Sequence, residues 1–217
     1  LAGEPVGGHG RRWQSRTHLS RERRRVGLQR LKLASLLQFT LPGVPCIYYG
    51  DEAGMEGYKD PFNRGPYPWG QEDKDLVLWY AELGQLRREL SCLKQGQFSP
   101  LQADGHCMAY VREDAVDALL VAVNAGDEPR TLYLPEQWRT ATALFGEEPD
   151  RNSAVTLPAR GCAVLTYQKH PSPAGPYALG KPETPEEAIE SIKDKIIENM
   201  DQKPELKKEL LDFLKKI

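Results

Sequence analysis

Apolar residues recur with a helical period in two segments of the first half of the chain. Leu33, Leu36, Leu37 and Leu41 are spaced three or four residues apart, which predicts an amphipathic helix over residues 26–39. The Pro-Gly pair at 42–43 ends this helix, because proline cannot continue it. The same spacing predicts a second helix over residues 72–90. Its apolar positions are Leu76, Trp79, Tyr80, Leu83, Leu86 and Leu90.

Between these two helices the pattern changes to a short uncharged run. Residues 44–48 are rich in β-branched and aromatic side chains, which is typical of a strand buried on both faces, as in a parallel sheet. Two acidic residues, Asp51 and Glu52, follow at once, and a loop rich in glycine and proline occupies residues 54–70. The order helix, strand, loop, helix predicts an α/β architecture for residues 26–94.

From residue 95 to residue 170 the apolar period is two, and turn residues separate short runs. Several short strands at this spacing predict an antiparallel β-sandwich. We expect strands at Phe98–Leu101, Cys107–Arg112, Ala118–Asn124, Thr131–Leu134, Thr140–Leu144, Ala154–Leu157 and Cys162–Tyr167.

The last part of the chain is predicted to be a linker and a helical tail. Five prolines and two glycines interrupt residues 171–185, which indicates a linker over 171–184. Thr184 and Pro185 then form a good helix start, and residues 185–217 carry two apolar stripes. Short helices must bury such stripes. The tail either packs on the rest of the chain or serves self-association or the docking of a partner.

Composition excludes several classes of protein. The formal charge of the 217 residues is −2, and no apolar run is long enough to span a membrane. Residues 1–32 hold nine Lys or Arg residues and two Glu residues, so residues 1–25 are predicted to be a basic, disordered arm, with nucleic-acid binding as the less favoured alternative. Four widely spaced cysteines without a Cys-x-x-Cys pair favour a reducing cytoplasm, with Cys46 and Cys162 as core residues.

Two motifs carry a family resemblance. The run Gly43-Val-Pro-Cys-Ile-Tyr-Tyr-Gly-Asp-Glu52, followed by Asp60-Pro-Phe-Asn-Arg64, resembles the last barrel strand of the α-amylase family of glycoside hydrolases, and most closely its neopullulanase and cyclomaltodextrinase subgroup. The resemblance implies the C-terminal end of a (β/α)8 barrel over residues 26–94 and a C-terminal β-domain over 95–170.

The resemblance also implies a sugar-binding loop. Asp60 and Arg64 would hydrogen-bond sugar hydroxyls, because a carboxylate accepts and a guanidinium donates in a rigid fork. The alternative is an ion pair that closes the loop on itself. Tyr48 and Tyr49 would stack on sugar faces or pack within the fold, as would Phe62, Tyr67 and Trp69.

Asp51 and Glu52 have two interpretations. Adjacent carboxylates suggest a general acid and base, but neighbours at a strand end point to opposite sides. The resemblance instead gives them the role of orienting the loop and nearby arginines. The catalytic carboxylates of relatives lie on earlier strands, and neither His9 nor His18 has the acidic neighbour of the family's His-Asp pair. We therefore expect a truncated or frame-shifted start.

The implied function is that of part of a retaining glycoside hydrolase acting on α-glucans such as cyclomaltodextrin, pullulan or maltooligosaccharides. The chain alone is expected to be inactive, with no catalytic residue, metal or organic cofactor of its own. A non-catalytic carbohydrate-binding module and an interaction protein are the open alternatives. The motifs leave the exact substrate and the oligomeric state open.

Overall fold

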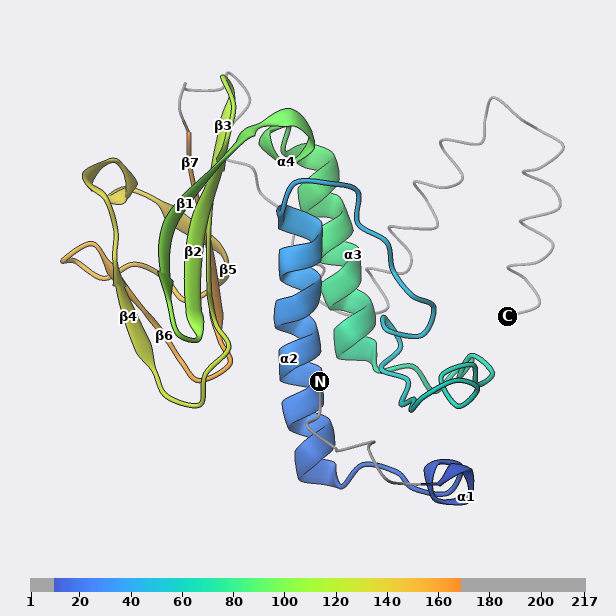
Figure 1. Cartoon of the computed structure of the whole chain (residues 1–217). Helices are drawn as coiled ribbons and strands as arrows, with labels where there is room; N and C mark the ends of the chain where they lie inside the picture. The colour runs from blue at the N-terminus through green and yellow to red at the C-terminus, as the bar shows by residue number, and fades with distance from the viewer. Residues whose placement is uncertain (1–9, 169–217) are drawn as a thin grey trace, which may run out of the picture. The chain divides into compact units, whose positions relative to one another are not determined.

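The computed structural model describes residues 10–168, which form helices followed by strands (Figure 1). The helices are α1 (Arg11–Gln14), α2 (Arg21–Thr40), α3 (Lys74–Glu89) and α4 (Cys92–Gln95). The strands are β1 (Gln97–Asp104), β2 (Cys107–Glu113), β3 (Asp117–Asn124), β4 (Arg130–Tyr133), β5 (Thr142–Gly146), β6 (Ala154–Leu157) and β7 (Cys162–Gln168), with a 3-10 turn at Glu136–Trp138. Both long predicted helices and the seven strands predicted between residues 95 and 170 are thereby confirmed, with shifts in their bounds.

The first long helix begins earlier than its apolar period predicts. The Ser20 hydroxyl caps α2 by accepting a hydrogen bond from the Arg23 amide (3.3 Å), and Glu22 lies in the positively polarised first turn. The prediction that residues 1–25 are disordered is therefore wrong for 10–25, which include α1 and the first turn of α2. Arginine is a good helix former, and such residues extend a helix without adding to its apolar stripe.

All strand pairs are antiparallel. One sheet has the order β1-β2-β3-β7-β5, and β4 and β6 form a second, two-stranded sheet. Every residue of the central strand β3 is buried. Its alternate residues contribute to two apolar clusters, because successive side chains of a strand point to opposite faces.

The first apolar cluster joins the helices to one face of the large sheet. Leu36 of α2 and Leu83 of α3 are fully buried in it, together with Leu119 and Val121 of β3. Figure 1 shows α2 and α3 side by side next to this sheet. The second cluster lies between the two sheets and includes Leu120, Val155, Leu157 and Trp138. The helices thus pack on one face of the large sheet, and the small sheet packs on its other face.

Residues 44–48 do not form the predicted buried strand. They lie in no strand, and the exposed fractions of Val44 and Ile47 are 93% and 43%. Cys46 is exposed as well, so its prediction as a core residue is also wrong. A strand needs neighbours for its hydrogen bonds, and no other segment of residues 10–168 lies beside this one in a sheet.

Other predictions concern the ends of the chain. Residues 1–9 of the basic arm, the linker 171–184 and the helical tail 185–217 lie outside the described residues, so their predicted structure stays a prediction. Across residues 10–168, none of the helices combines the length and the apolar character needed to cross a bilayer.

Candidate functional site

The loop between α2 and α3 carries every residue that the sequence predicts for the site. Two close approaches shape it. A Cβ atom at Gly50, whose φ is +91°, would lie 2.3 Å from the Met55 sulfur, and a Cβ at Gly57 would lie 3.0 Å from the Cα of Asn63. Glycine at these two positions therefore lets the loop fold back on itself.

Asp60 and Arg64 lie across a tight turn from each other. Arg64 donates from Nε to Asp60 Oδ1 (2.9 Å) and from Nη2 to Asp60 Oδ2 (3.3 Å), so the pair is bidentate. The Asp60–Pro61 peptide bond within the turn is cis. The side chains are 60% and 66% exposed, so the ion pair adds little to stability. The polar edges of the two groups face each other, and the exposed parts of both side chains remain open to a ligand from solvent.

Tyr48 and Tyr49 come just before this loop and contact each other. Their ring centroids are 5.2 Å apart, and the planes are tilted by 42°. The Tyr49 hydroxyl donates to the carbonyl of Gly65 (3.0 Å), which ties the tyrosine pair to the loop. Both rings are nearly half exposed, which leaves apolar ring surface open to solvent.

Asp51 and Glu52 have different surroundings. The Glu52 carboxylate accepts from the Gly50 amide (3.0 Å), and burial followed by the charge of Glu52 raises the pKa of Tyr67, at the other end of the loop. Burial, and then the charge of Glu52, raise the pKa of Asp51 above its usual value. The expected role of Asp51 and Glu52 in orienting the loop and nearby arginines stays a prediction.

Glu56 is a residue that the sequence interpretation missed. Its carboxylate accepts from Arg24 Nη1 (3.0 Å) and from the Leu19 amide (3.0 Å), and His18 Nδ1 lies 3.7 Å away. A contact between Trp13 and Tyr58 (5.4 Å between ring centroids) adds to this attachment. The segment before α2 is therefore fixed to the candidate loop. No periodic pattern marks these contacts, which join residues far apart in sequence.

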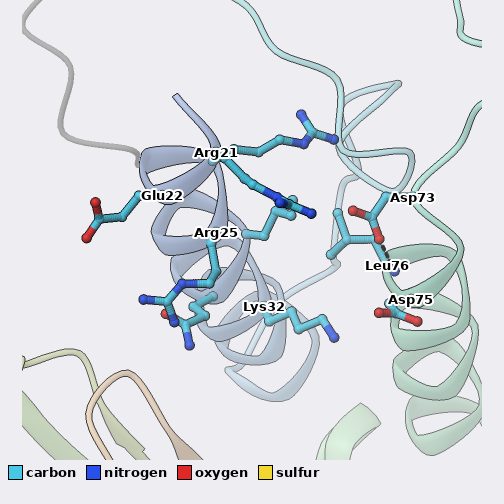
Figure 2. A pocket seen from close by; sticks show the side chains of 10 residues that line it. Arg21, Glu22, Arg25, Lys32, Asp73, Asp75 and Leu76 are labelled. Atoms are coloured by element: carbon cyan, nitrogen blue, oxygen red, sulfur yellow. Dashed lines mark hydrogen bonds between the residues drawn. The ribbon is translucent and has the colours of Figure 1, made fainter. Parts of the chain in front are cut away.

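A separate pocket of about 620 Å³ lies between α2 and the start of α3 (Figure 2). Its lining mixes both charges, with Arg21, Arg25 and Lys32 on α2 and Asp73 and Asp75 near the start of α3. Its full lining is Arg21, Glu22, Arg24, Arg25, Leu28, Gln29, Lys32, Asp73, Asp75 and Leu76. None of the residues predicted for sugar binding is among them, so this hollow is distinct from the candidate site.

Metal and disulfide chemistry find no support in the part of the chain that the structure describes. No group of three His, Cys, Asp or Glu side chains there is arranged to hold a metal ion. All four cysteines fall within these residues and none is paired with another. Burial raises the pKa of the Cys92 thiol to about 12, which keeps this thiol protonated at neutral pH.

Comparison with known proteins identifies the protein family to which the chain belongs. The sequence profile described as "Alpha amylase, catalytic domain" matches residues 9–141, well over half of the chain. The fold therefore belongs to the barrel-type glycoside hydrolases, with antiparallel sheets in its second part. The chain is a member of the α-amylase family, in agreement with the resemblance of its two motifs.

Individual relatives agree with membership of the α-amylase family. The chain is 47% identical over 87 residues to an amylopullulanase from Thermoanaerobacter thermohydrosulfuricus, covering 40% of this chain and 6% of that protein. It is 42% identical over 108 residues to a cyclomaltodextrinase from Bacillus sp., covering 48% and 19%. The structure of the type III pullulan hydrolase from Thermococcus kodakarensis matches with a TM-score of 0.58 and 30% identity, covering 70% of this chain and 25% of that one. The chain thus spans at most about a quarter of the length of these relatives.

Proposed function

We propose that this chain is the C-terminal part of a retaining glycoside hydrolase that acts on α-glucans, and that its loop over residues 54–70 binds glucose units. The matches to proteins named cyclomaltodextrinase and amylopullulanase support this substrate class. In this proposal α2, residues 44–48 and α3 are the end of a (β/α)8 barrel, and the strands β1–β7 are a C-terminal β-sandwich domain.

The proposal rests mainly on the exposed bidentate ion pair between Asp60 and Arg64, which we call the fork. Each partner already holds the other in a defined geometry, so little side-chain freedom is lost when a sugar binds. The carboxylate can accept from one hydroxyl of a glucose unit while the guanidinium donates to the next. Tyr48 and Tyr49 lie before the same loop and offer ring faces for stacking.

We assign no catalytic carboxylate to this chain. Retaining glycosidases use two carboxyl groups about 5 Å apart on opposite sides of the scissile bond. Asp51 and Glu52 are adjacent in sequence, and the Glu52 carboxylate accepts a hydrogen bond from the Gly50 amide. The chain by itself is therefore expected to bind α-glucan without hydrolysing it. A cytoplasmic location is part of the same proposal.

Calorimetric titration of the full chain with maltoheptaose tests the proposal. Asp60→Ala and Arg64→Ala are each expected to weaken binding about tenfold, because each removes charge-assisted hydrogen bonds to sugar hydroxyls.

The matched control is Glu136→Ala, which breaks another exposed ion pair, that between Glu136 and Arg139 (3.7 Å). This variant should bind like the unaltered chain. Equal affinity in all variants would show that the Asp60–Arg64 pair only closes the loop.

A further inference from the structure

The pocket between α2 and the start of α3 has a cationic wall (Figure 2). Arg21 and Arg25 lie one helical turn apart on α2, and Lys32 follows two turns later on the same face. Like charges at this spacing repel each other on a helix. In the part of the chain that the structure describes, neither arginine forms an ion pair with a carboxylate. An anion from solvent would therefore relieve this repulsion.

The other charged residues on the α2 side do not cancel this charge. The Arg24 guanidinium is paired with Glu56 (3.0 Å between Nη1 and Oε1). Figure 2 shows the Glu22 carboxylate pointing away from the ends of Arg21 and Lys32. The α2 wall thus offers three cationic groups to a ligand. Guanidinium groups suit phosphate in particular, because they can donate two parallel hydrogen bonds to its oxygens.

The opposite wall carries hydrogen-bond acceptors. Asp73 and Asp75 lie at the start of α3, and Asp73 Oδ1 accepts from the Leu76 amide (3.2 Å). Carboxylates accept hydrogen bonds from hydroxyl groups and repel phosphate. The pocket therefore distinguishes the two ends of a ligand, with an anionic group next to α2 and hydroxyl groups next to α3.

The end of the pocket near the start of α3 is held in place by the loop that precedes α3. The Asp73 amide donates to the Ala53 carbonyl (3.0 Å). A Cβ atom at Gly54, whose φ is +69°, would lie 3.2 Å from the Cβ of Asp73 and from Cδ1 of Leu76. The pocket volume of about 620 Å³ lies within the range of roughly 300–1,000 Å³ that is usual for small-molecule sites. A preformed pocket of this size accommodates a monosaccharide that carries a phosphate group.

We propose that this pocket binds a sugar phosphate. The phosphate group lies against Arg21, Arg25 and Lys32, and the sugar hydroxyls donate to Asp73 and Asp75. The inference goes beyond the proposed function, because the pocket shares neither its lining residues nor its ligand with the Asp60–Arg64 fork.

Calorimetric titration of the full chain with glucose 6-phosphate tests the site. Arg21→Gln and Arg25→Gln should each weaken binding about tenfold, because each removes charge-assisted hydrogen bonds to the phosphate. In the unaltered chain, raising the NaCl concentration from about 50 to about 300 mM should also weaken binding, because salt screens the attraction. This second measurement does not depend on the folding of a variant.

Inorganic phosphate, titrated alongside, separates the two ends of the ligand. The unaltered chain should bind it more weakly than glucose 6-phosphate. Asp75→Ala should weaken the binding of glucose 6-phosphate about threefold, because a hydroxyl acceptor is lost. It should not weaken the binding of inorganic phosphate, because removing a carboxylate lowers the repulsion of the anion. Equal affinities of the unaltered chain for the two compounds would show that only free phosphate is recognised, and the proposal would be wrong.

Arg139→Gln is the matched control, because Arg139 is an exposed arginine outside the pocket lining. This variant, and Asp60→Ala in the fork, should bind glucose 6-phosphate like the unaltered chain. Unchanged affinity in Arg21→Gln and Arg25→Gln, or no binding by the unaltered chain, would overturn the pocket proposal and leave the proposed function standing. If Asp60→Ala weakens binding as much as Arg25→Gln does, the sugar phosphate binds at the fork and the pocket proposal is also wrong.

Discussion

At the residue scale, Arg112 of β2 connects the helices to the sheet. Its side chain is 1% exposed and donates to the carbonyls of Thr40 (2.8 Å), Cys92 (2.9 Å) and Gly96 (3.1 Å), with a longer contact to Leu93. Burial lowers the pKa of Arg112 from its usual value. A guanidinium at the C-terminal ends of α2 and α4 also meets the negative ends of their helix dipoles. One side chain thereby hydrogen-bonds the last carbonyl of α2, at Thr40, and carbonyls along and just after α4.

Replacing this arginine should destabilise the chain. Arg112→Met keeps an apolar chain of similar length and removes the guanidinium donor from the carbonyls of Thr40, Leu93 and Gly96, so the free energy of unfolding should fall by about 2–4 kcal/mol. Urea unfolding followed by circular dichroism measures this. Arg139→Met, at an exposed arginine, should change stability by less than about 0.5 kcal/mol. Equal stability of the two variants would mean that desolvation of the guanidinium cancels its hydrogen bonds.

At the element scale, the sequence predicted most helices and strands but not all their bounds. The seven strands follow from an apolar period of two, which the pairing of β2, β3 and β7 reproduces. The start of α2 was placed too late, because Ser20 and the arginines after it carry no apolar signal. Residues 44–48 have the composition of a buried strand, yet composition cannot say which segment pairs with them. The Glu56 contacts escaped prediction because they join residues 32 to 37 positions apart.

The attachment of the segment before α2 gives a prediction at this scale. Glu56→Gln removes the charge that pairs with Arg24 and weakens the contact with the Leu19 amide. The segment should then open more often, and trypsin should cleave after Arg16 about fivefold faster. Mass spectrometry of timed digests measures this rate. Glu136→Gln is the control, and identical rates in the two variants would show that Glu56 does not hold the segment.

At the scale of the whole molecule, the two apolar clusters share the central strand β3. Leu119 and Val121 pack toward the helices, and Leu120 packs toward the small sheet. The sequence suggested a boundary near residue 95 because the apolar period changes there from helical to alternating. The period of apolar residues shows which face of a helix or strand is apolar. It does not show which apolar faces of different elements pack against each other. The Asp60–Arg64 ion pair was one of two interpretations of the motif, whereas the contact between the Tyr67 and Trp69 rings is visible only in the folded loop.

A shared core predicts cooperative unfolding of the described residues. Trp79 packs against the first cluster and Trp138 is buried in the second, so each reports on one part of the core. In two variants that keep only Trp79 or only Trp138, with the other three tryptophans replaced by Phe, the fluorescence should give urea transitions that coincide with the circular dichroism transition of the same variant. If the helices unfolded at a lower urea concentration than the strands, cooperative unfolding through the shared strand β3 would be contradicted.

The central claim is that this chain recognises α-linked glucose. The most direct test is to compare the dissociation constants of the full chain for maltoheptaose and for cellohexaose, which differ in the stereochemistry of their linkages and by one glucose unit in length. We predict binding of maltoheptaose at least about tenfold tighter, because the fork and the aromatic rings lie on one folded loop whose geometry suits one linkage. Equal affinities, or no binding of maltoheptaose, would contradict the claim.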